Sequence, residues 1–267
     1  MLANAMASVR PPAVSGTFYP DDPGELSAAV SRFLESAPPR EWAKAIVAPH
    51  AGYVYSGPIA ARAFRCLSPE VSRVVLLGPS HFAPLRGLAV PNAAAFETPL
   101  GRVELELPGD LPRSDAAHAR EHSLEVELPF LQLALRELRL VPIVVGHAQP
   151  AEVADVLARL WGGAETAIVV SSDLSHYLRY DDARRADEET ARRIEQLVPV
   201  PDHAACGAAP LNGLLFEAAR RGMRCERLDL RNSGDTAGDR SRVVGYGAFA
   251  FYESGKAMSA LSSGGQA

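Results

Sequence analysis

The chain has 267 residues, of which 47% are hydrophobic and 22% are charged. A globular domain of this size buries roughly three quarters of the surface of its unfolded chain, so it needs no disulfide to be stable. The formal net charge of −5 argues against a nucleic-acid-binding protein, which requires a basic surface. No segment approaches the roughly 18 apolar residues of a membrane span. The N-terminus lacks the pattern of a signal peptide.

The cysteine content favours a reducing compartment. The three cysteines, Cys66, Cys206 and Cys225, are too few and too scattered for a disulfide framework, and there is no CxxC motif. We therefore expect a cytoplasmic protein. Cys66 and Cys225 lie in apolar helix and strand patterns and are predicted to be core residues.

The first predicted helix covers residues 23–37. Asp22 is a suitable N-cap, Pro23 suits the first helical position, and apolar residues then recur at helical spacing. The helix is expected to end before Pro38 and Pro39, because proline cannot continue a helix.

Two buried strands with a helix between them follow. The apolar run 45–48 leads to His50, and the run 74–77 leads to His81. Short apolar runs that end at turn residues are typical of the buried strands of an α/β sheet. The intervening helix is predicted to open at Ser56.

The middle of the chain changes character. Residues 84–114 are rich in Pro and Gly, with short strand-like pieces, which indicates an antiparallel insertion or sheet edge. A helix is predicted over 124–138, with Pro129 causing a late start or a kink. A strand over 140–145 and a helix over 152–161 follow.

A third buried strand, 168–170, begins the last part of the chain. Because strands and helices alternate, we predict a three-layer αβα sandwich around a central mixed sheet. The chain is expected to form a single domain, 1–267, with its core over 9–252 and a flexible C-terminal tail over 254–267. The remaining predicted elements are helices at 182–197 and 205–221 and strands at 226–230 and 243–252.

Three buried strands each end at a histidine or an acid. These are His50, His81 and the pair Asp173 and His176. Since ligands of α/β proteins bind at the carboxyl ends of the strands, these side chains are expected to share one rim, as a metal or acid–base site. A lone histidine at a strand end is more often a structural hydrogen-bonding group. Ser172 or Asp173 can also act as the N-cap of a following helix, which explains the serines and the aspartate but not His176.

Two further sites remain open from the residues alone. His122 and Glu125 are three apart and are expected on one helix face, but the order is the reverse of the Glu-x-x-His metal motif, and an ordinary acidic helix start fits as well. Cys206 stands near a predicted helix start, where it is either a small buried residue or a thiolate ligand. The other histidines are predicted to be surface or loop residues: His118, His147 and His203.

Six short segments, in this order, resemble the Memo-like family, whose prokaryotic members are called AmmeMemoRadiSam system protein B. The resemblance covers residues 9–252. The segments are Gly16-Thr17-Phe18-Tyr19, Ala48-Pro49-His50-Ala51-Gly52-Tyr53, Gly78-Pro79-Ser80-His81, Glu121-His122-Ser123-Leu124-Glu125, Ser171-Ser172-Asp173-Leu174-Ser175-His176 and Cys206-Gly207.

The resemblance implies a fold related to class III extradiol dioxygenases, the ring-cleaving enzymes that use non-haem Fe(II). By their motifs, His50, His81 and Cys206 are expected to be the metal ligands, with His176 as the acid–base residue and Asp173 beside it. Ring-cleaving enzymes bind iron through two histidines and a carboxylate. A cysteine in place of the carboxylate shifts the metal preference toward copper, zinc or thiolate-bound iron. Fe(II) is the expected divalent metal, with Cu or Zn as alternatives.

The remaining motif residues are expected to form or support the pocket. The family often has Trp in its first motif and after the last histidine, whereas this chain has Phe18 and Tyr177. The pocket is therefore expected to keep aromatic walls without indole donors. The predicted pocket residues are Phe18, Tyr19, Tyr53, His122, Glu125 and Tyr177.

Three functions follow as expectations. The first is a redox or O₂-dependent role on a small substrate, in functional association with a radical-SAM protein, as the family resemblance implies. The second is a non-catalytic module that captures a peptide or partner in the same cleft. The third is a zinc hydrolase that uses metal-activated water. Neither nucleic acid nor a membrane is expected as a partner.

Overall fold

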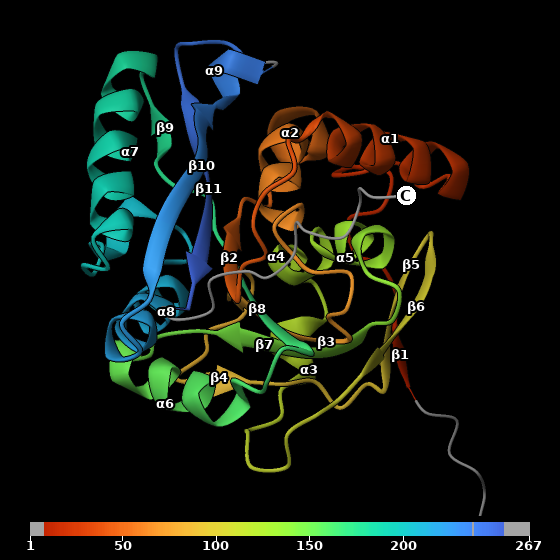
Figure 1. Cartoon of the computed structure of the whole chain (residues 1–267). Coiled ribbons are helices and arrows are strands. Elements are labelled where there is room, and N and C mark those ends of the chain that lie inside the picture. The colour runs from red at the N-terminus through yellow and green to blue at the C-terminus, as the bar shows by residue number, and fades with distance from the viewer. Residues whose placement is uncertain (1–7, 237, 254–267) are drawn as a thin grey trace, which may run out of the picture.

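Four parallel strands form the centre of the computed structural model, which describes residues 8–236 and 238–253 (Figure 1). The predicted tail over 254–267 lies outside the described residues. The four strands lie side by side in the order β7, β3, β8 and β2. Their bounds are Arg139–Val145 for β7, Arg73–Pro79 for β3, Thr166–Ser171 for β8 and Ala45–Ala48 for β2.

These strands are apolar on both faces because helices cover both faces. Successive side chains of a strand point to opposite sides, so Ile46 packs into one hydrophobic cluster and Val47 into the other. Leu76 and Leu77 divide in the same way. This explains why the strands have continuous apolar runs rather than alternating polar and apolar residues.

The outer strands make the sheet mixed. Its order is β1-β5-β6-β7-β3-β8-β2-β11-β10, in which β5 is antiparallel to β6, and β11 is antiparallel to both β2 and β10. Two short strands attach to it: β4 pairs with β7, and β9 pairs with β11. The bounds are Val9–Arg10 for β1, Leu88–Ala89 for β4, Ala95–Thr98 for β5, Gly101–Leu105 for β6, His176–Leu178 for β9, Arg224–Asn232 for β10 and Val243–Tyr252 for β11.

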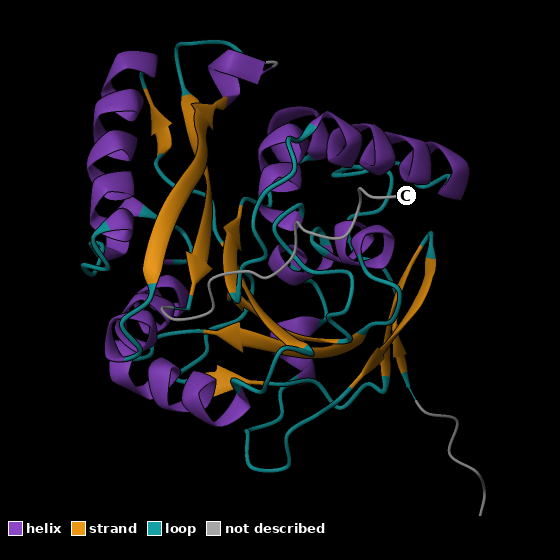
Figure 2. Ribbon diagram, viewed as in Figure 1, coloured by secondary structure: helices purple, strands orange, loops and turns teal. Residues whose placement is uncertain are grey.

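Helices form the two outer layers (Figure 2). On one face lie α1 (Pro23–Ser36), α2 (Tyr53–Phe64), α4 (His122–Glu125) and α5 (Leu128–Ala134), whose apolar side chains join one buried cluster. On the other lie α6 (Pro150–Leu160), α7 (Tyr180–Glu195) and α8 (Ala208–Arg220), which join the second. This arrangement confirms the predicted three-layer sandwich around a mixed sheet. The short helices are α3 (Asp115–His118), η1 (Asp202–Ala204) and α9 (Ser233–Thr236).

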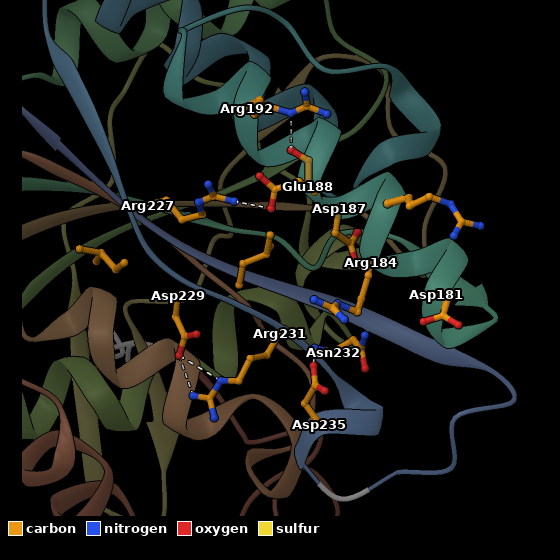
Figure 3. Close-up of a pocket in the computed structure, with 13 residues that line it drawn as sticks. Asp181, Arg184, Asp187, Glu188, Arg192, Arg227, Asp229, Arg231, Asn232 and Asp235 are labelled. Carbon is orange, nitrogen blue, oxygen red and sulfur yellow. Dashed lines mark hydrogen bonds and ion pairs between the residues drawn. The ribbon is translucent and has the colours of Figure 1, made fainter.

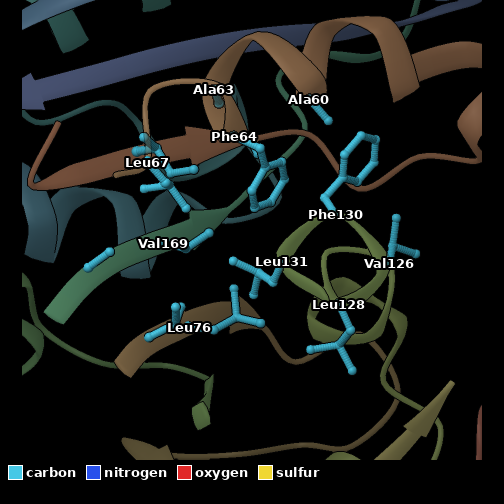
Figure 4. Packing of buried hydrophobic residues seen from close by; sticks show 14 of the residues in the cluster. Ala60, Ala63, Phe64, Leu67, Leu76, Val126, Leu128, Phe130, Leu131 and Val169 are labelled. Carbon is cyan, nitrogen blue, oxygen red and sulfur yellow. The ribbon is translucent and has the colours of Figure 1, made fainter. Parts of the chain in front are cut away.

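Aromatic stacking joins two helices of the first helical layer above the sheet (Figure 4). Phe64 of α2 stacks on Phe130 of α5 with their ring centroids 5.1 Å apart and their planes nearly parallel. Leu76 of β3 and Val169 of β8 are buried in the same cluster. Burial of large side chains like these is the main stabilising contribution to such a core.

Helix boundaries differ from prediction where proline is involved. The helix predicted from Ser56 begins earlier, at Tyr53. Pro58 therefore lies inside α2, where it removes one hydrogen bond without ending the helix. The helix predicted over 124–138 is two short helices, α4 and α5, with Pro129 in the first turn of the second. Proline has no N–H to donate and favours a first-turn position, so a new helix begins there.

A groove of about 860 Å³ lies between α7 and β10, the strand at one end of the sheet order (Figure 3). Arg227 pairs with Glu188, and Arg231 pairs with Asp229. The positive charges of these two arginines in the groove are therefore balanced by neighbouring carboxylates. Arg185 likewise pairs with Asp182 on the solvated face of α7. No helix within the described ranges is long and apolar enough to cross a membrane.

Candidate metal centre

The carboxyl ends of β2, β3 and β8 bring the predicted site residues together. The three strands are adjacent and parallel, so His50 follows β2, His81 follows β3 and Asp173 follows β8 at the same sheet edge. Cys206 joins them from the loop before α8. One ring nitrogen of His50, one of His81 and the sulfur of Cys206 all lie within 4.8 Å of one another.

His50 is the buried member of the cluster. Its backbone N–H donates to Asp173 Oδ1 at 2.9 Å, and its ring Nδ1 lies 2.7 Å from Ser171 Oγ. The other ring nitrogen, Nε2, lies 3.4 Å from Cys206 Sγ. Burial, together with the neighbouring histidines, holds the pKa of His50 well below its ordinary value. The imidazole is therefore neutral at pH 7, as a metal ligand must be.

His81 is fixed by a buried carboxylate. Glu121, the N-cap of α4, accepts the backbone N–H of His81 at 2.6 Å and lies 2.8 Å from its Nδ1. Burial by itself raises the pKa of Glu121, but the hydrogen bonds from His81 and from the Ser123 backbone N–H outweigh burial and bring the pKa to about 2. An ionised Glu121 accepts the Nδ1 proton and leaves Nε2 of His81 free.

Cys206 is held against the end of β8. The backbone N–H of Asp173 donates to Cys206 Sγ at 3.3 Å. Burial, with a further contribution from the nearby Asp173 carboxylate, raises the pKa of the Cys206 thiol above its ordinary value. Without a bound cation the thiol is therefore protonated at neutral pH, and metal binding as a thiolate requires release of that proton.

These donors fit a divalent transition metal. Metal-bound histidines usually donate their second ring N–H to a carboxylate or another oxygen, and both His50 and His81 have such a partner at Nδ1. Bonds of about 2.1 Å to nitrogen and about 2.3 Å to sulfur at a tetrahedral angle place the two ligands about 3.6 Å apart. The 3.4 Å between His50 Nε2 and Cys206 Sγ matches that spacing.

Two of the predicted polar residues have partners that the sequence did not reveal. His176 lies on strand β9, and its Nδ1 donates to the Leu174 carbonyl at 2.8 Å, so this carbonyl and not the neighbouring Asp173 sets its tautomer. Asp173 instead accepts from His50, and burial raises its pKa to about 7. No helix begins at Ser172 or Asp173, because the chain enters β9.

His122 and Glu125 both lie on α4, and their side chains have separate partners. The His122 ring lies against the cluster, with its centroid 4.7 Å from that of His81, and it also contacts Phe18 at 4.8 Å. Glu125 is fully buried and pairs with Arg10 at 2.7 Å. A helix start, the alternative reading of this segment, describes α4 correctly, and Glu125 ties the N-terminal segment to it.

The predicted tyrosines have different surroundings. The Tyr19 hydroxyl donates to Glu125 Oε1 at 2.6 Å, and the Tyr53 hydroxyl donates to the Val126 carbonyl at 2.7 Å, so both buried rings support the α4–α5 segment. Tyr177 is exposed beside His176 and has a φ of 60°. A non-glycine residue in this left-handed region is strained, and such strain is concentrated at functional sites.

Two glycines allow helices to approach the strand ends. A Cβ at Gly78 would lie 2.5 Å from Ser123 Oγ, and a Cβ at Gly207 would lie 2.7 Å from Ser172 Cβ. Both distances are shorter than real Cβ contacts, so only glycine fits here without displacing its neighbours. Gly207 thereby seats the start of α8, and with it Cys206, against the end of β8.

Several contributing residues were not predicted. Glu121 was part of a quoted motif, but only tertiary structure places it against His81. Ser171 and Glu127 lie beneath His50 in the same way. His118 was predicted at the surface or in a loop; this was wrong, because it is buried on α3 and hydrogen-bonds to the Ala89 carbonyl. The residues around His118 show no regular spacing of apolar side chains from which its burial could have been predicted.

Known proteins resemble the chain over almost its whole length. A model of the Memo-like protein family matches residues 10–250. A MEMO1 family protein of Aquifex aeolicus is 38% identical, with 89% of this chain and 97% of the relative covered. Relatives with the same description from Aeropyrum pernix and Sulfolobus acidocaldarius are 36% and 34% identical, with 89% of this chain and 98% and 97% of the relatives covered. The chain therefore belongs to the Memo-like family.

Proposed function

We propose that the chain binds one divalent metal ion through His50, His81 and Cys206 and has a redox or O₂-dependent role on a small substrate. The observation that carries the proposal is the tethering of both histidines at Nδ1, by Ser171 and Glu121, close to the Cys206 sulfur. Three converging donors leave further coordination positions for substrate or O₂, as in non-haem iron enzymes.

The donor set supports particular metals. Two imidazoles and a thiolate suit iron, copper or zinc better than magnesium or calcium, which prefer oxygen ligands. Fe(II) is the proposed metal because of the family's resemblance to extradiol dioxygenases. When bound, the ion supplies Lewis acidity and, as iron, one-electron chemistry with O₂.

We assign proton transfer to His176. Its Nδ1 proton is committed to the Leu174 carbonyl, so Nε2 carries the lone pair of the neutral ring. Partial desolvation outweighs the hydrogen bond to the Leu174 carbonyl and lowers the pKa of His176, which keeps the ring unprotonated at neutral pH. His176 can therefore accept a proton at Nε2. Asp173, with a pKa of about 7, adds a second group that titrates near neutrality.

One observation favours a second function, capture of a peptide or partner. Large aromatic side chains remain exposed near the cluster: Phe82 is 47% exposed and Tyr177 is 63% exposed. Phe82 also packs edge-on against His122 and His81. Exposed aromatic rings around a polar centre are typical of binding surfaces. In this alternative the histidine cluster contributes recognition rather than turnover.

Metal analysis of protein purified without oxygen separates the alternatives. About one iron per chain supports the redox proposal, about one zinc supports a zinc hydrolase, and protein that neither contains nor binds a metal supports the binding module. The same preparation is then assayed for oxygen uptake over a panel of phenolic compounds. A His50→Ala variant is the control, because oxygen uptake that persists in it does not come from this site.

A further inference from the structure

A glutamate without a cationic partner lies beneath the histidine cluster. Glu127, just before α5, is completely buried, and its Oε1 lies 2.7 Å from Ser171 Oγ. Its second oxygen, Oε2, has no hydrogen-bond partner. Within residues 8–236 and 238–253, no Lys, Arg or His forms an ion pair with it. A buried carboxylate with so few partners would be very costly.

The Ser171 hydroxyl identifies which neighbours carry protons. Three groups lie 2.7 Å from Ser171 Oγ: His50 Nδ1, the Ser123 carbonyl and Glu127 Oε1. A hydroxyl donates one hydrogen bond and accepts two. The Ser123 carbonyl can only accept, so it receives the hydroxyl proton. The other two short contacts are hydrogen bonds only if His50 and Glu127 both donate to Ser171.

We propose that Glu127 is a neutral carboxylic acid that acts as a positioning residue, donating to Ser171 so that Ser171 accepts the Nδ1 proton of His50. The lone pair of His50 is then on Nε2, the nitrogen that faces Cys206. The Ser171 hydroxyl then donates to the Ser123 carbonyl and accepts from both His50 and Glu127, so all of its hydrogen bonds are made. The site is thus prepared for a metal ligand before any ion arrives.

Two further observations support a neutral Glu127. An unpartnered Oε2 costs much less as the carbonyl oxygen of an acid than as half of a carboxylate. Burial outweighs the opposing effect of the hydrogen bond with Ser171 and raises the pKa of Glu127 well above its ordinary value, and Asp173 adds to this rise. A neutral acid also adds no second negative charge beside Asp173.

Glu125, two residues earlier, provides an internal comparison. It is also fully buried, but it pairs with Arg10 and accepts from the backbone N–H groups of Ala13 and Val14 and from the Tyr19 hydroxyl. This set of donors suits a carboxylate. The two buried glutamates are therefore expected to respond in opposite ways to replacement by the neutral glutamine.

The first test compares Glu127→Gln with Glu125→Gln. A glutamine amide can donate to Ser171 as the acid does, so Glu127→Gln is expected to keep the thermal midpoint of the unmodified protein. Glu125→Gln leaves Arg10 buried without a counter-charge and is expected to lower the midpoint by several degrees. An equal loss in both variants would overturn the proposal.

Spectroscopy then tests the protonation states in metal-free protein. Infrared spectra at about pH 9, where carboxyls of ordinary or modestly raised pKa are ionised, are expected to show a protonated-carboxyl band that is absent in Glu127→Gln and present in Glu125→Gln. Long-range ¹⁵N spectra, assigned with His50→Asn, are expected to show the Nδ1–H tautomer of His50. The absence of the band from the unmodified protein contradicts the proposal even if no variant folds, and an Nε2–H tautomer of His50 contradicts it as well.

The consequence for the metal rests on the proposed function and is tested separately. Ser171→Ala removes the acceptor for the Nδ1 proton of His50 and is expected to weaken cobalt binding by roughly 10–100-fold. Unchanged affinity would contradict the positioning role. If the unmodified protein binds no cobalt, the proposed function fails, whereas the spectra still decide whether Glu127 is neutral.

Discussion

The chemistry of the site at the scale of single residues depends on the Cys206 thiol. Burial and the nearby Asp173 carboxylate both raise its pKa, so the free protein carries a neutral thiol at every pH near neutrality. The buried His50, in contrast, has a lowered pKa and needs to lose no proton. Metal binding as a thiolate therefore releases at least the proton of Cys206.

Metal affinity is accordingly expected to rise with pH. Below the raised pKa of the thiol, release of the Cys206 proton alone increases the affinity about tenfold per pH unit, equivalent to about 1.4 kcal/mol. Competition titrations with cobalt between about pH 6 and pH 8 measure this slope. In Cys206→Ser we expect weaker binding and a flatter dependence. The same slope in the serine variant would exclude Cys206 as a ligand.

His176 is expected to behave differently from the ligands. His176→Ala should keep the metal, because the ring donates to the Leu174 carbonyl and is not part of the three-donor cluster. Any turnover should fall roughly 10²–10⁴-fold, the usual contribution of a positioned acid–base residue. Metal content is measured first and turnover second. Loss of metal from this variant would make His176 a ligand.

At the scale of elements, the start of α8 positions the sulfur ligand. Cys206 directly precedes the N-cap Gly207, whose backbone N–H donates to Ser172 Oγ at 3.0 Å. Asp173, which follows Ser172 in the chain, has a backbone N–H that donates to Cys206 Sγ. The end of β8 and the start of α8 are thus joined at two points, so Cys206 cannot move independently of the sheet.

Gly207→Ala tests this junction. The new Cβ would overlap Ser172 and force the start of α8 away, which we expect to cost about 1–3 kcal/mol of unfolding free energy and at least about tenfold in cobalt affinity. Gly109→Ala is the matched control, because a Cβ there meets nothing within 4 Å. Denaturant unfolding and cobalt titration of both variants give the comparison. Equal behaviour of the two would show that close packing at Gly207 is unimportant.

At the scale of the whole molecule, the apolar core and the metal centre are separable. Phe64 lies at the last residue of α2, whereas the cluster lies beside the first. Phe64→Ala is expected to destabilise the protein by about 3–5 kcal/mol while the folded fraction keeps its metal stoichiometry. Calorimetry measures the loss of stability, and metal analysis measures the metal stoichiometry of the folded protein. Metal loss at full folding would contradict the separation.

Much of the architecture could be predicted because it depends on local pattern. The apolar runs before His50 and His81 identified the central strands, and adjacent parallel strands necessarily end at the same sheet edge. The N-cap at Asp22 likewise marked the start of α1 within a residue. These features depend on residues close together in sequence, which a single chain displays directly.

The partners of the site residues could not be predicted, since they depend on tertiary contacts. Glu121 is 40 positions from His81, and Ser171 is 121 positions from His50. His118 is buried because Ala89 supplies an acceptor and Arg10 donates to its carbonyl, neither of which leaves a mark near it in the sequence. Similarly, the Ser and Asp residues of the loop after β8 also suit an N-cap, so the sequence left open a helix start where the chain instead enters β9.

Cobalt spectroscopy tests the central claim most directly. Co(II) bound by a thiolate shows a sulfur-to-metal charge-transfer band, and we predict about one Co(II) per chain with this band in the unmodified protein. The band should disappear in Cys206→Ser and persist in Cys225→Ser, since Cys225 lies on β10 away from the cluster. A chain that binds no Co(II), or a band that survives in Cys206→Ser, would contradict a metal centre of His50, His81 and Cys206.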